Sequence, residues 1–280
     1  MPLLRKLRHQ VAKTPARSPL VWFRHKTLKA NDAFLGSYPR SGSTWLRFVL
    51  FESFAGQDSG FQNVDHAIPD VKMRNFAMPL MPDGGRLIKT HEVYHSEYRK
   101  AVYLVRDPRD VALSEYAYQT TLGLVDCDLD EYLKRFLRDG VNPFAAWRTH
   151  VDSWLAAPLG PEHLLVLRFE DLRKDTFHNV VRIAEFLGLT PDEARIRKAI
   201  ANNTVDRMRA KEKQTPTRVT KSGRFVGKGS VGGWRGQLNP AQAGLFRKYA
   251  GDVLGRLGYA LDAEQIPASV LADVPCAEAS

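Results

Sequence analysis

The sequence contains few cysteines and no long hydrophobic run. Its two cysteines, Cys127 and Cys276, lie far apart in a chain of 280 residues, which argues against a disulfide-stapled scaffold and favours a reducing compartment. No apolar stretch approaches the ~20 residues that a membrane-spanning helix needs. Residues 1–20 also lack the continuous apolar segment of a secretory signal. We therefore expect a cytoplasmic protein.

Acidic residues are scarce in two parts of the chain. Overall, 41 Lys and Arg residues outnumber 31 Asp and Glu residues, for a formal net charge of +10. Residues 1–30 contain eight bases and no acid, residues 206–235 contain nine bases and two acids, and residues 261–280 contain four acids and no base. An even positive surface is typical of general nucleic-acid binding. The uneven distribution instead favours a local anionic ligand and no nucleic acid as partner.

The chain divides into a basic N-terminal arm at 1–30, one domain at 31–260 and an acidic C-terminal tail at 261–280. No internal repeat or long linker interrupts the middle part, so a single domain is the simplest interpretation. In the arm, apolar residues between Leu3 and Val11 fall near one helical face among basic side chains. This pattern allows contact with a membrane surface, but we favour an arm that is solvated or packed on the domain.

Short apolar runs alternate with helical patterns along the domain. The runs predict strands at residues 33–38, 87–90, 101–105 and 163–169. Helices are predicted at residues 42–54, 108–120, 177–187 and 240–257, two of which begin with Pro after the capping residues Asp107 and Asn239. This alternation predicts an α/β fold, a single domain with a central, mainly parallel sheet flanked by helices. Such sheets bind ligands at the carboxyl ends of their strands.

The segment after the first predicted strand, Tyr38-Pro39-Arg40-Ser41-Gly42-Ser43-Thr44-Trp45, suits an anion. Gly42 permits a tight turn, and the N–H groups that begin the next helix lack partners within it. The positive end of the helix dipole adds to the hydroxyl groups and the Arg40 charge, as in a phosphate site. The segment is not a Walker A loop, because Ser43 stands where that motif has lysine. A phosphate-loop kinase or other nucleotide-binding protein stays as the alternative, and a basic nucleic-acid binder as a third.

Three further segments accompany this loop, and the four together resemble a known family. They read Lys89-Thr90-His91 at a predicted strand end, Arg106 to Ser114 after the next strand, and Gly227 to Arg235 near the C-terminus. In this order they resemble the sulfotransferases that use 3′-phosphoadenosine 5′-phosphosulfate (PAPS), with the cytosolic type of domain. The loops resemble that family's 5′-phosphosulfate loop, catalytic strand end, 3′-phosphate element and C-terminal glycine-rich loop. The resemblance covers about residues 32–259 and implies a P-loop-NTPase-like sulfotransferase fold.

The resemblance implies a donor and the residues that bind it. PAPS would be the sulfuryl donor, adenosine 3′,5′-bisphosphate the product, and no metal would be needed. By their match to the family motifs, the donor-binding residues would be Arg40, Ser41, Gly42, Ser43, Thr44, Trp45, Arg106, Ser114, Thr204, Lys228 and Gly229. For Trp45 two interpretations stay open, stacking near the adenine or packing in the core.

The catalytic residues would be His91, Lys89 and Arg40. Lys89 and His91 are two positions apart on a strand, so both side chains project from one face. His91 would be the general base that takes the proton of the acceptor hydroxyl, since an imidazole titrates near pH 6.5. Lys89 would steady the sulfuryl oxygens, and Arg40 the leaving phosphate, during an in-line transfer. His95 is a competing candidate, whereas other histidines (His66, His150 and His178) have no comparable neighbours in sequence.

This chain departs from the family pattern at four of the matching positions. Arg40 replaces a lysine, and because it does not release its proton near neutral pH it can stabilise the leaving group by charge but not act as a general acid. Gly227 replaces an arginine, Gly233 an aspartate and Phe169 a tyrosine. Arg224 is a candidate to supply the missing guanidinium.

The acceptor is the least determined part of the prediction. The reaction class requires a hydroxyl or amine group on a small molecule, a glycan or a lipid. Residues 58–81 and 126–142 are the candidate walls of the acceptor site. The short dimer motif of the family is absent, which leaves the oligomeric state open.

Overall fold

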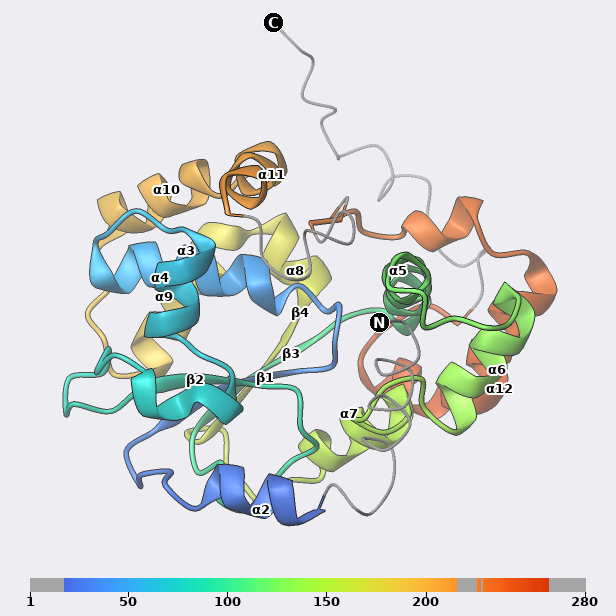
Figure 1. The fold of residues 1–280 in the computed structure, drawn as a ribbon, viewed down its shortest axis with the longest axis horizontal. Coiled ribbons are helices and arrows are strands. Elements are labelled where there is room, and N and C mark those ends of the chain that lie inside the picture. Colours follow the sequence, from blue (N-terminus) through green and yellow to red (C-terminus); the bar gives the residue numbers. More distant parts are fainter. Residues whose placement is uncertain (1–17, 216–225, 228, 262–280) are drawn as a thin grey trace, which may run out of the picture.

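The computed structural model describes residues 18–215, 226–227 and 229–261 (Figure 1). Four strands form its sheet, namely β1 (Ala33–Ser37), β2 (Leu87–Thr90), β3 (Ala101–Val105) and β4 (Leu164–Arg168). The helices up to β4 are α2 (Ser18–His25), α3 (Ser43–Ala55), α4 (Phe61–Ala67), η2 (Val71–Phe76), α5 (Pro108–Thr121), α6 (Leu129–Arg138) and α7 (Trp147–Leu155). Those after it are α8 (Phe169–Lys174), α9 (Thr176–Phe186), α10 (Glu193–Asn202), α11 (Val205–Gln214), η4 (Gly233–Gly236) and α12 (Pro240–Arg256).

The sheet has the order β2-β1-β3-β4, and every neighbouring pair of its strands is parallel. The predicted parallel sheet is therefore confirmed. In register, Leu35 of β1 lies beside Lys89 of β2 and Val102 of β3. Parallel strands in register end at one edge, so the segments that follow β1, β2 and β3 start close together. The predicted strands extend too far at three ends, because Tyr38 begins a turn, His163 ends one and Phe169 begins α8.

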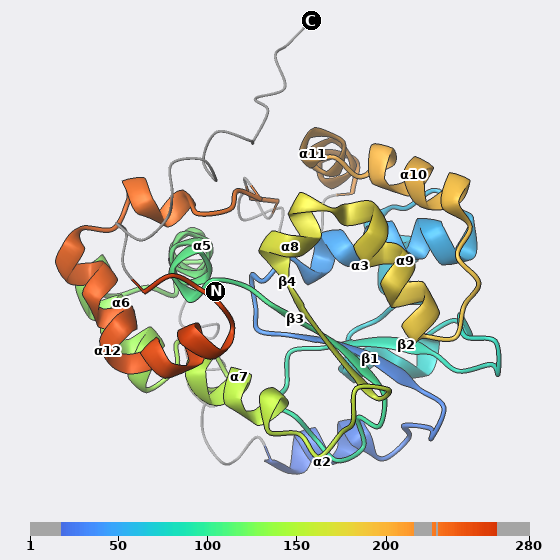
Figure 2. The same cartoon turned by 180° about the vertical axis from the view of Figure 1, so that it is seen from behind.

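Helices cover both faces of the sheet. Figure 1 shows α3, α4, α9 and α10 on one side and α5, α6, α7 and α12 on the other, and Figure 2 shows the same division from behind. Because side chains alternate along a strand, β1 sends Leu35 into one hydrophobic core and Phe34 into the other. The parallel strands are buried on both faces, as expected for this architecture.

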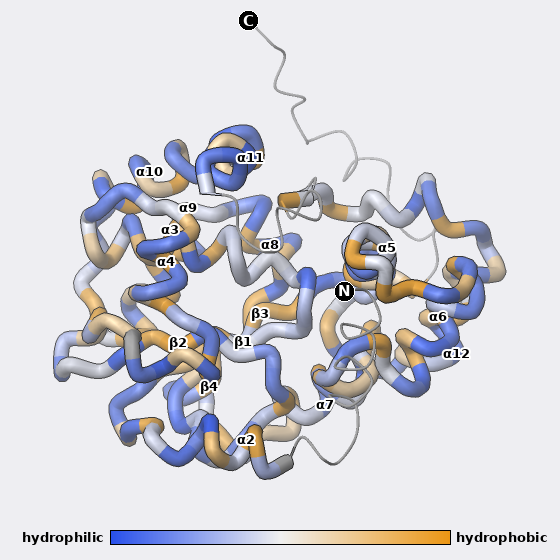
Figure 3. Tube along the Cα trace, in the orientation of Figure 1, coloured by the Kyte–Doolittle hydropathy of each residue, from blue (hydrophilic) through white to orange (hydrophobic). Residues whose placement is uncertain are grey.

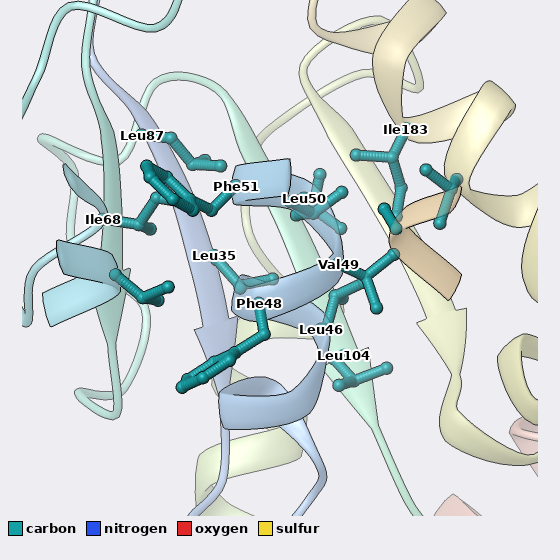
Figure 4. Close-up of a cluster of buried hydrophobic side chains, with 14 of the residues drawn as sticks. Leu35, Leu46, Phe48, Val49, Leu50, Phe51, Ile68, Leu87, Leu104 and Ile183 are labelled. Carbon is teal, nitrogen blue, oxygen red and sulfur yellow. The ribbon is translucent and has the colours of Figure 1, made fainter. Parts of the chain in front are cut away.

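Helix α3 contributes most to the core on its side of the sheet. Figure 4 shows Leu46, Val49 and Leu50 of this helix packed between Leu35 of β1 and Ile183 of α9. This packing holds the first turn of α3, and with it the loop that joins β1 to α3, against the sheet.

The caps predicted for two helices are present. Asp107 accepts a hydrogen bond from the N–H of Arg109 at the start of α5, and Asn239 accepts one from the N–H of Gln242 at the start of α12. Both helices have Pro at their first position, where its missing N–H costs nothing. The predicted helix at 177–187 is confirmed as α9, and it starts one residue earlier than expected.

Apolar segments lie mainly inside the molecule. In Figure 3, β3 is orange at the centre while the outward-facing α11 is mostly blue. None of the helices described is long and apolar enough to cross a membrane.

The described end of the predicted arm packs on the domain. In α2, the His25 ring bonds to the Tyr98 hydroxyl at 2.6 Å, and Arg74 of η2 donates to the carbonyl oxygen of Phe23 at 2.9 Å. Helix α2 thus contacts the domain, while residues 1–17, which include the segment from Leu3 to Val11, and residues 262–280 lie outside the described residues.

Candidate functional site

The loop between β1 and α3 has a strained backbone. Arg40 has a positive φ of 66° and Gly42 one of 95°, a region that costs a non-glycine residue about 1–3 kcal/mol. A Cβ atom at Gly42 would come within 2.5 Å of the Phe169 ring, so this turn requires glycine. Arg106 holds the strained residue in place, because its Nη1 donates to the carbonyl oxygen of Arg40 at 3.0 Å.

Two polar atoms around this loop are buried and have no hydrogen-bond partner within the described part of the chain. One is Oγ of Ser41, whose side chain is fully buried, and the other is Nε of Arg106. Unpaired buried donors cost about 1–3 kcal/mol each, so a ligand that accepts from them is favoured. Together with the N–H groups at the start of α3, they fit an anionic donor.

Arg106 connects three segments that are distant in sequence. Its Nη2 donates to the carbonyl oxygen of Ser230 at 2.9 Å, and its guanidinium stacks 4.6 Å from the centre of the Phe169 ring. The competing interpretation of Arg106 is an ordinary surface ion pair with Asp107 or Asp110. Only Asp110 comes within 4.0 Å, and Arg106 itself is buried. Arg106 therefore joins the β1–α3 loop to the C-terminal loop.

Arg40 and Ser114, predicted at two different phosphate sites, are in contact. Nε of Arg40 donates to Oγ of Ser114 at 3.1 Å, and the guanidinium lies 4.7 Å from the Tyr118 ring centre. Burial lowers the pKa of Arg40 from its usual value, and the nearby Glu115 charge opposes that shift.

Asp110 anchors the C-terminal glycine-rich loop, a role that the sequence analysis missed. Its carboxylate accepts the N–H groups of Gly232 at 2.8 Å and Trp234 at 2.9 Å. The family has an aspartate where this chain has Gly233, but a Cβ there would meet Ser230 Oγ at 2.9 Å. The carboxylate that accepts these N–H groups belongs to α5. Burial raises the pKa of Asp110 above its usual value.

His91 lies directly after β2, against the end of β1. Its Nδ1 is 2.6 Å from the carbonyl oxygen of Ser37, so Nδ1 carries the proton and Nε2 carries the lone pair. Across the described residues Nε2 has no hydrogen-bond partner, and the Phe144 ring faces the imidazole at 5.6 Å. The pKa of His91 lies well below its usual 6.5, mainly because the imidazole is buried and also because of the nearby Lys89 charge. The imidazole is therefore neutral at pH 7 and able to accept a proton.

Lys89 forms an ion pair that the sequence did not indicate. Its Nζ is 3.4 Å from Oδ2 of Asp70, which begins η2, and both side chains are largely buried. Burial would raise the pKa of Asp70, but Lys89 and then Lys72 outweigh it and hold that pKa well below its usual range. Burial lowers the pKa of Lys89, and Asp70 opposes the shift. Asp70 lies in the segment 58–81 predicted as an acceptor wall.

His150, which has no comparable neighbours in sequence, contacts the backbone of the candidate base. His150 of α7 is fully buried, and its Nε2 donates to the carbonyl oxygen of His91 at 3.0 Å. The Tyr103 hydroxyl donates to its Nδ1 at 3.0 Å, and burial lowers the pKa of His150 to about 4. A neutral His150 therefore fixes the backbone of the candidate base. His95, the competing candidate, instead pairs with Glu97 and stacks on His25 at 4.2 Å.

The other side of the loop is lined by Trp45. Its indole N–H donates to the carbonyl oxygen of Asn203 at 2.8 Å, its ring meets the Phe169 ring edge-on at 6.2 Å, and it is only partly buried. Trp45 thus packs on the core with part of its surface free. Thr204 is exposed and caps α11 by accepting the N–H of Arg207 at 3.4 Å.

A buried carboxylate under this region ties α3 to α10 and α11. Glu52 accepts from Asn203 at 2.9 Å, from Lys211 at 3.0 Å and from both the N–H and the hydroxyl of Ser59. Burial raises the pKa of Glu52, but these hydrogen bonds outweigh burial and lower it overall. The network positions Asn203, which holds the Trp45 indole.

Some predicted residues fall outside the described part of the chain. Lys228 and Arg224 are among them, whereas Gly229 is described and has a positive φ of 62°. A Cβ there would lie 3.5 Å from Val205, which puts the loop beside the start of α11. No cluster of His, Cys, Asp and Glu suited to a metal ion occurs among the residues described.

Comparison with known proteins shows the family to which this chain belongs. The family model described as "Sulfotransferase domain" matches residues 30–258. Sulfotransferase 2A6 of Rattus norvegicus is 30% identical over 242 residues, 79% of this chain and 84% of that protein. Sulfotransferase 2A1 of Mus musculus is 31% identical over 243 residues, 79% of this chain and 83% of that protein. In fold, the chain is similar to mouse sulfotransferase SULT7A1 complexed with PAP, with a TM-score of 0.62 at 23% identity over 81% of this chain and 84% of that one.

Proposed function

Because this chain belongs to the sulfotransferase domain family, we propose that it transfers a sulfuryl group from PAPS to a hydroxyl or amine group of its acceptor. The observation that carries the proposal is the position of His91. Its neutral imidazole lies where β1 ends and the anion-binding loop begins, with Nδ1 engaged and the lone pair on Nε2. The kinase alternative lacks the loop lysine that it requires.

The β1–α3 loop and Arg106 would hold the donor. Ser41 Oγ, the N–H groups at the start of α3 and the Arg40 guanidinium suit the 5′-phosphosulfate, and Arg106 with Ser114 suits the 3′-phosphate. Trp45 and Phe169 offer ring surfaces to the adenine. When bound, PAPS supplies an activated sulfuryl group on a phosphate leaving group.

His91 would act as general base. Nε2 accepts the proton of the acceptor hydroxyl, while the Nδ1–H bond to Ser37 keeps the ring in the required tautomer. His150 holds the backbone at the same point. Because the pKa of His91 is lowered by burial, the imidazole is ready to accept a proton throughout the neutral range.

Lys89 would stabilise negative charge on the sulfuryl oxygens. It follows Leu87 on the face of β2 that packs toward α3, and Asp70 holds its ammonium group. Fixed positive charge in a partly buried site is the main contribution expected for a loose, in-line transfer.

The acceptor, the location and the partners are part of the proposal. We propose a small-molecule, glycan or lipid acceptor that reaches His91 between η2 and Phe144, at the edge of the predicted walls. A cytoplasmic location is supported by the relative named Cytosolic sulfotransferase 13 of Arabidopsis thaliana, 25% identical over 248 residues.

Calorimetric titration with adenosine 3′,5′-bisphosphate tests donor binding. We expect the wild-type chain to bind, and Arg106→Ala to bind at least about tenfold more weakly, because a charge-assisted pair is worth ~1.5–3 kcal/mol. Arg195→Ala, which removes an exposed arginine paired with Asp192, is the matched control. Absence of binding by the wild-type chain would refute the proposal.

Sulfuryl transfer to a panel of acceptors tests the base. His91→Ala should lower kcat by about 10²–10⁴-fold while leaving the Kd for the bisphosphate nearly unchanged. The control is His178→Ala, an exposed histidine on α9. Full turnover by His91→Ala would remove His91 from the mechanism.

A further inference from the structure

The segment that joins α6 to α7 has a strained backbone (Figure 1). Ala145 has a positive φ of 70°, which disfavours a residue with a side chain. Gly140 has a φ of 79°, and a Cβ atom there would lie 2.6 Å from the carbonyl oxygen of Ala145. Such a backbone persists only where its surroundings fix it. Phe144, the residue before Ala145, carries the ring that faces the His91 imidazole at 5.6 Å.

Asn142 bonds this segment to Tyr38, the first residue after β1. Its Nδ2 donates to the Tyr38 hydroxyl at 3.0 Å, and its Oδ1 accepts the backbone N–H of Phe144 at 3.0 Å. The Tyr38 hydroxyl in turn donates to the carbonyl oxygen of Ala145 at 3.3 Å. Asn142 and Tyr38 are both buried. The backbone on each side of the Phe144 side chain is therefore held by one of these two residues.

Two buried side chains of α5 extend the network. Oε1 of Glu115 accepts from Nε2 of Gln119 at 2.8 Å and from Nδ2 of Asn142 at 3.4 Å. Gln119 also donates to the carbonyl oxygen of Val141 at 3.1 Å. The orientation of the Asn142 amide is thereby determined, because the Phe144 N–H requires an oxygen and the Glu115 carboxylate requires an N–H. A buried network of this kind favours a single conformation of the segment.

We propose that Asn142 is a positioning residue for the base, because it holds the Phe144 ring against the His91 imidazole. This inference rests on the proposed function. The ring covers one side of the imidazole and so preserves the buried surroundings in which His91 stays neutral. Without the Asn142 amide, the Phe144 N–H and the Tyr38 hydroxyl each lose a partner, and the strained segment is free to move away from His91.

Charged and titratable groups of three elements also act on His91. Burial lowers the pKa of His91 most, Lys89 of β2 lowers it further, Asp70 of η2 raises it, and His150 of α7 lowers it. The hydrogen bonds of Asn142 go to other residues, so its replacement changes the cover of the imidazole and leaves these three groups in place.

NMR of the histidine side chains tests the inference. The pKa of His91 is measured from the ring signals of the chain labelled with ¹⁵N-histidine, and these signals are identified by their loss in His91→Gln. In Asn142→Ala the pKa of His91 should rise toward 6.5, because water then stabilises the charged imidazole. The matched control is Asn179→Ala, which removes an asparagine that bonds to backbone carbonyls next to α9 and should leave the pKa of His91 unchanged.

Kinetics on the acceptor panel separate positioning from general damage. In Asn142→Ala the acidic limb of the kcat profile should move to higher pH, since the base must be neutral to accept a proton. At pH 7.5, kcat/KM for the acceptor should fall about 3- to 10-fold, while the Kd for adenosine 3′,5′-bisphosphate changes less than about twofold. Asn142→Ser should restore part of the loss, because a serine oxygen can still accept the Phe144 N–H two residues on.

The outcomes separate this inference from the proposed function. The NMR measurement requires neither donor nor acceptor, and an unchanged pKa of His91 in Asn142→Ala overturns the inference alone. Absent bisphosphate binding by the wild-type chain, or full turnover by His91→Ala, overturns the proposed function and with it a base to position. If Asn142→Ala does not fold, Tyr38→Phe is the second variant, because it keeps the ring and removes the hydroxyl that bonds Asn142 and Ala145. It should also raise the pKa of His91, and an unchanged pKa again overturns the inference.

Discussion

The ion pair between Lys89 and Asp70 leads to the most direct prediction. Nζ and Oδ2 are 3.4 Å apart, with 12% of the lysine side chain and 25% of the aspartate side chain exposed. At this distance the attraction is about 1 kcal/mol in bulk water and about 5 kcal/mol at an effective dielectric constant of ~20. Asp70→Asn keeps the size of the side chain and removes this attraction.

The expected effect on catalysis follows from the charge of Lys89. Burial, with the Arg47 and Lys72 charges, then acts on the ammonium group without opposition from Asp70, so the pKa of Lys89 falls further and the basic limb of the kcat profile moves to lower pH. We expect kcat at pH 7.5 to fall at least about tenfold, since 1.4 kcal/mol corresponds to a factor of ten. The matched control is Asp126→Asn, which removes an exposed carboxylate paired with Arg135.

The same variant has a thermodynamic signature. The pKa of Asp70 is lower in the folded than in the unfolded chain, so its stabilising contribution is present above about pH 4 and is lost as the pH falls through the folded value. Thermal melts should show wild type more stable than Asp70→Asn at pH 7, with the gap narrowing below about pH 4. A variant with an unshifted pH profile and full kcat would refute the role of Asp70.

Three further variants test the supports of the site. His150→Phe removes the hydrogen bond to the His91 carbonyl, so kcat should fall about tenfold while the Kd for the bisphosphate stays unchanged; a lower affinity instead would show a general loss of structure. Asp110→Asn can accept only one of the two loop N–H groups, and the unpaired donor, worth ~1–3 kcal/mol, should weaken bisphosphate binding roughly 10- to 100-fold by calorimetry. Glu52→Gln leaves Lys211 without its buried partner, which costs up to about 3–5 kcal/mol and should lower Tm by about 10 °C in a thermal melt. An unchanged Tm would show that Glu52 is not a structural anchor.

Much of the fold follows from local patterns. The strands at Leu87–Thr90 and Ala101–Val105 match the apolar runs of the sequence residue for residue, and the caps at Asp107 and Asn239 start their helices as expected. Propensities and capping act between neighbours in the chain, so the sequence displays them directly. Strand β4 ends one residue before the predicted end, because Phe169 begins α8 and packs on Gly42.

Some features of the candidate site follow from the local sequence, and others depend on contacts between distant segments. The sequence by itself determined the glycine turn before α3 and the place of Lys89 and His91 at the end of β2, since a glycine turn, a helix start and a strand end are local features. Only the tertiary structure decided which residues support them. Asp70 and His150 come from other elements and carry no motif of their own. Their roles depend on burial and on contacts across the sheet, which no spacing in the sequence displays.

Arg40 shows both contributions, that of the local sequence and that of the tertiary structure, at a single residue. Its position in the loop predicts a cation beside the 5′ end of the donor. Its hydrogen bond to Ser114, 74 residues away, appears only when the loop after β1 and α5 are brought together. The sequence determined that a positive charge belongs to this loop, and the fold decided that it lies against Ser114 and Tyr118 of α5, because the direction of a long side chain is set by its packing partners.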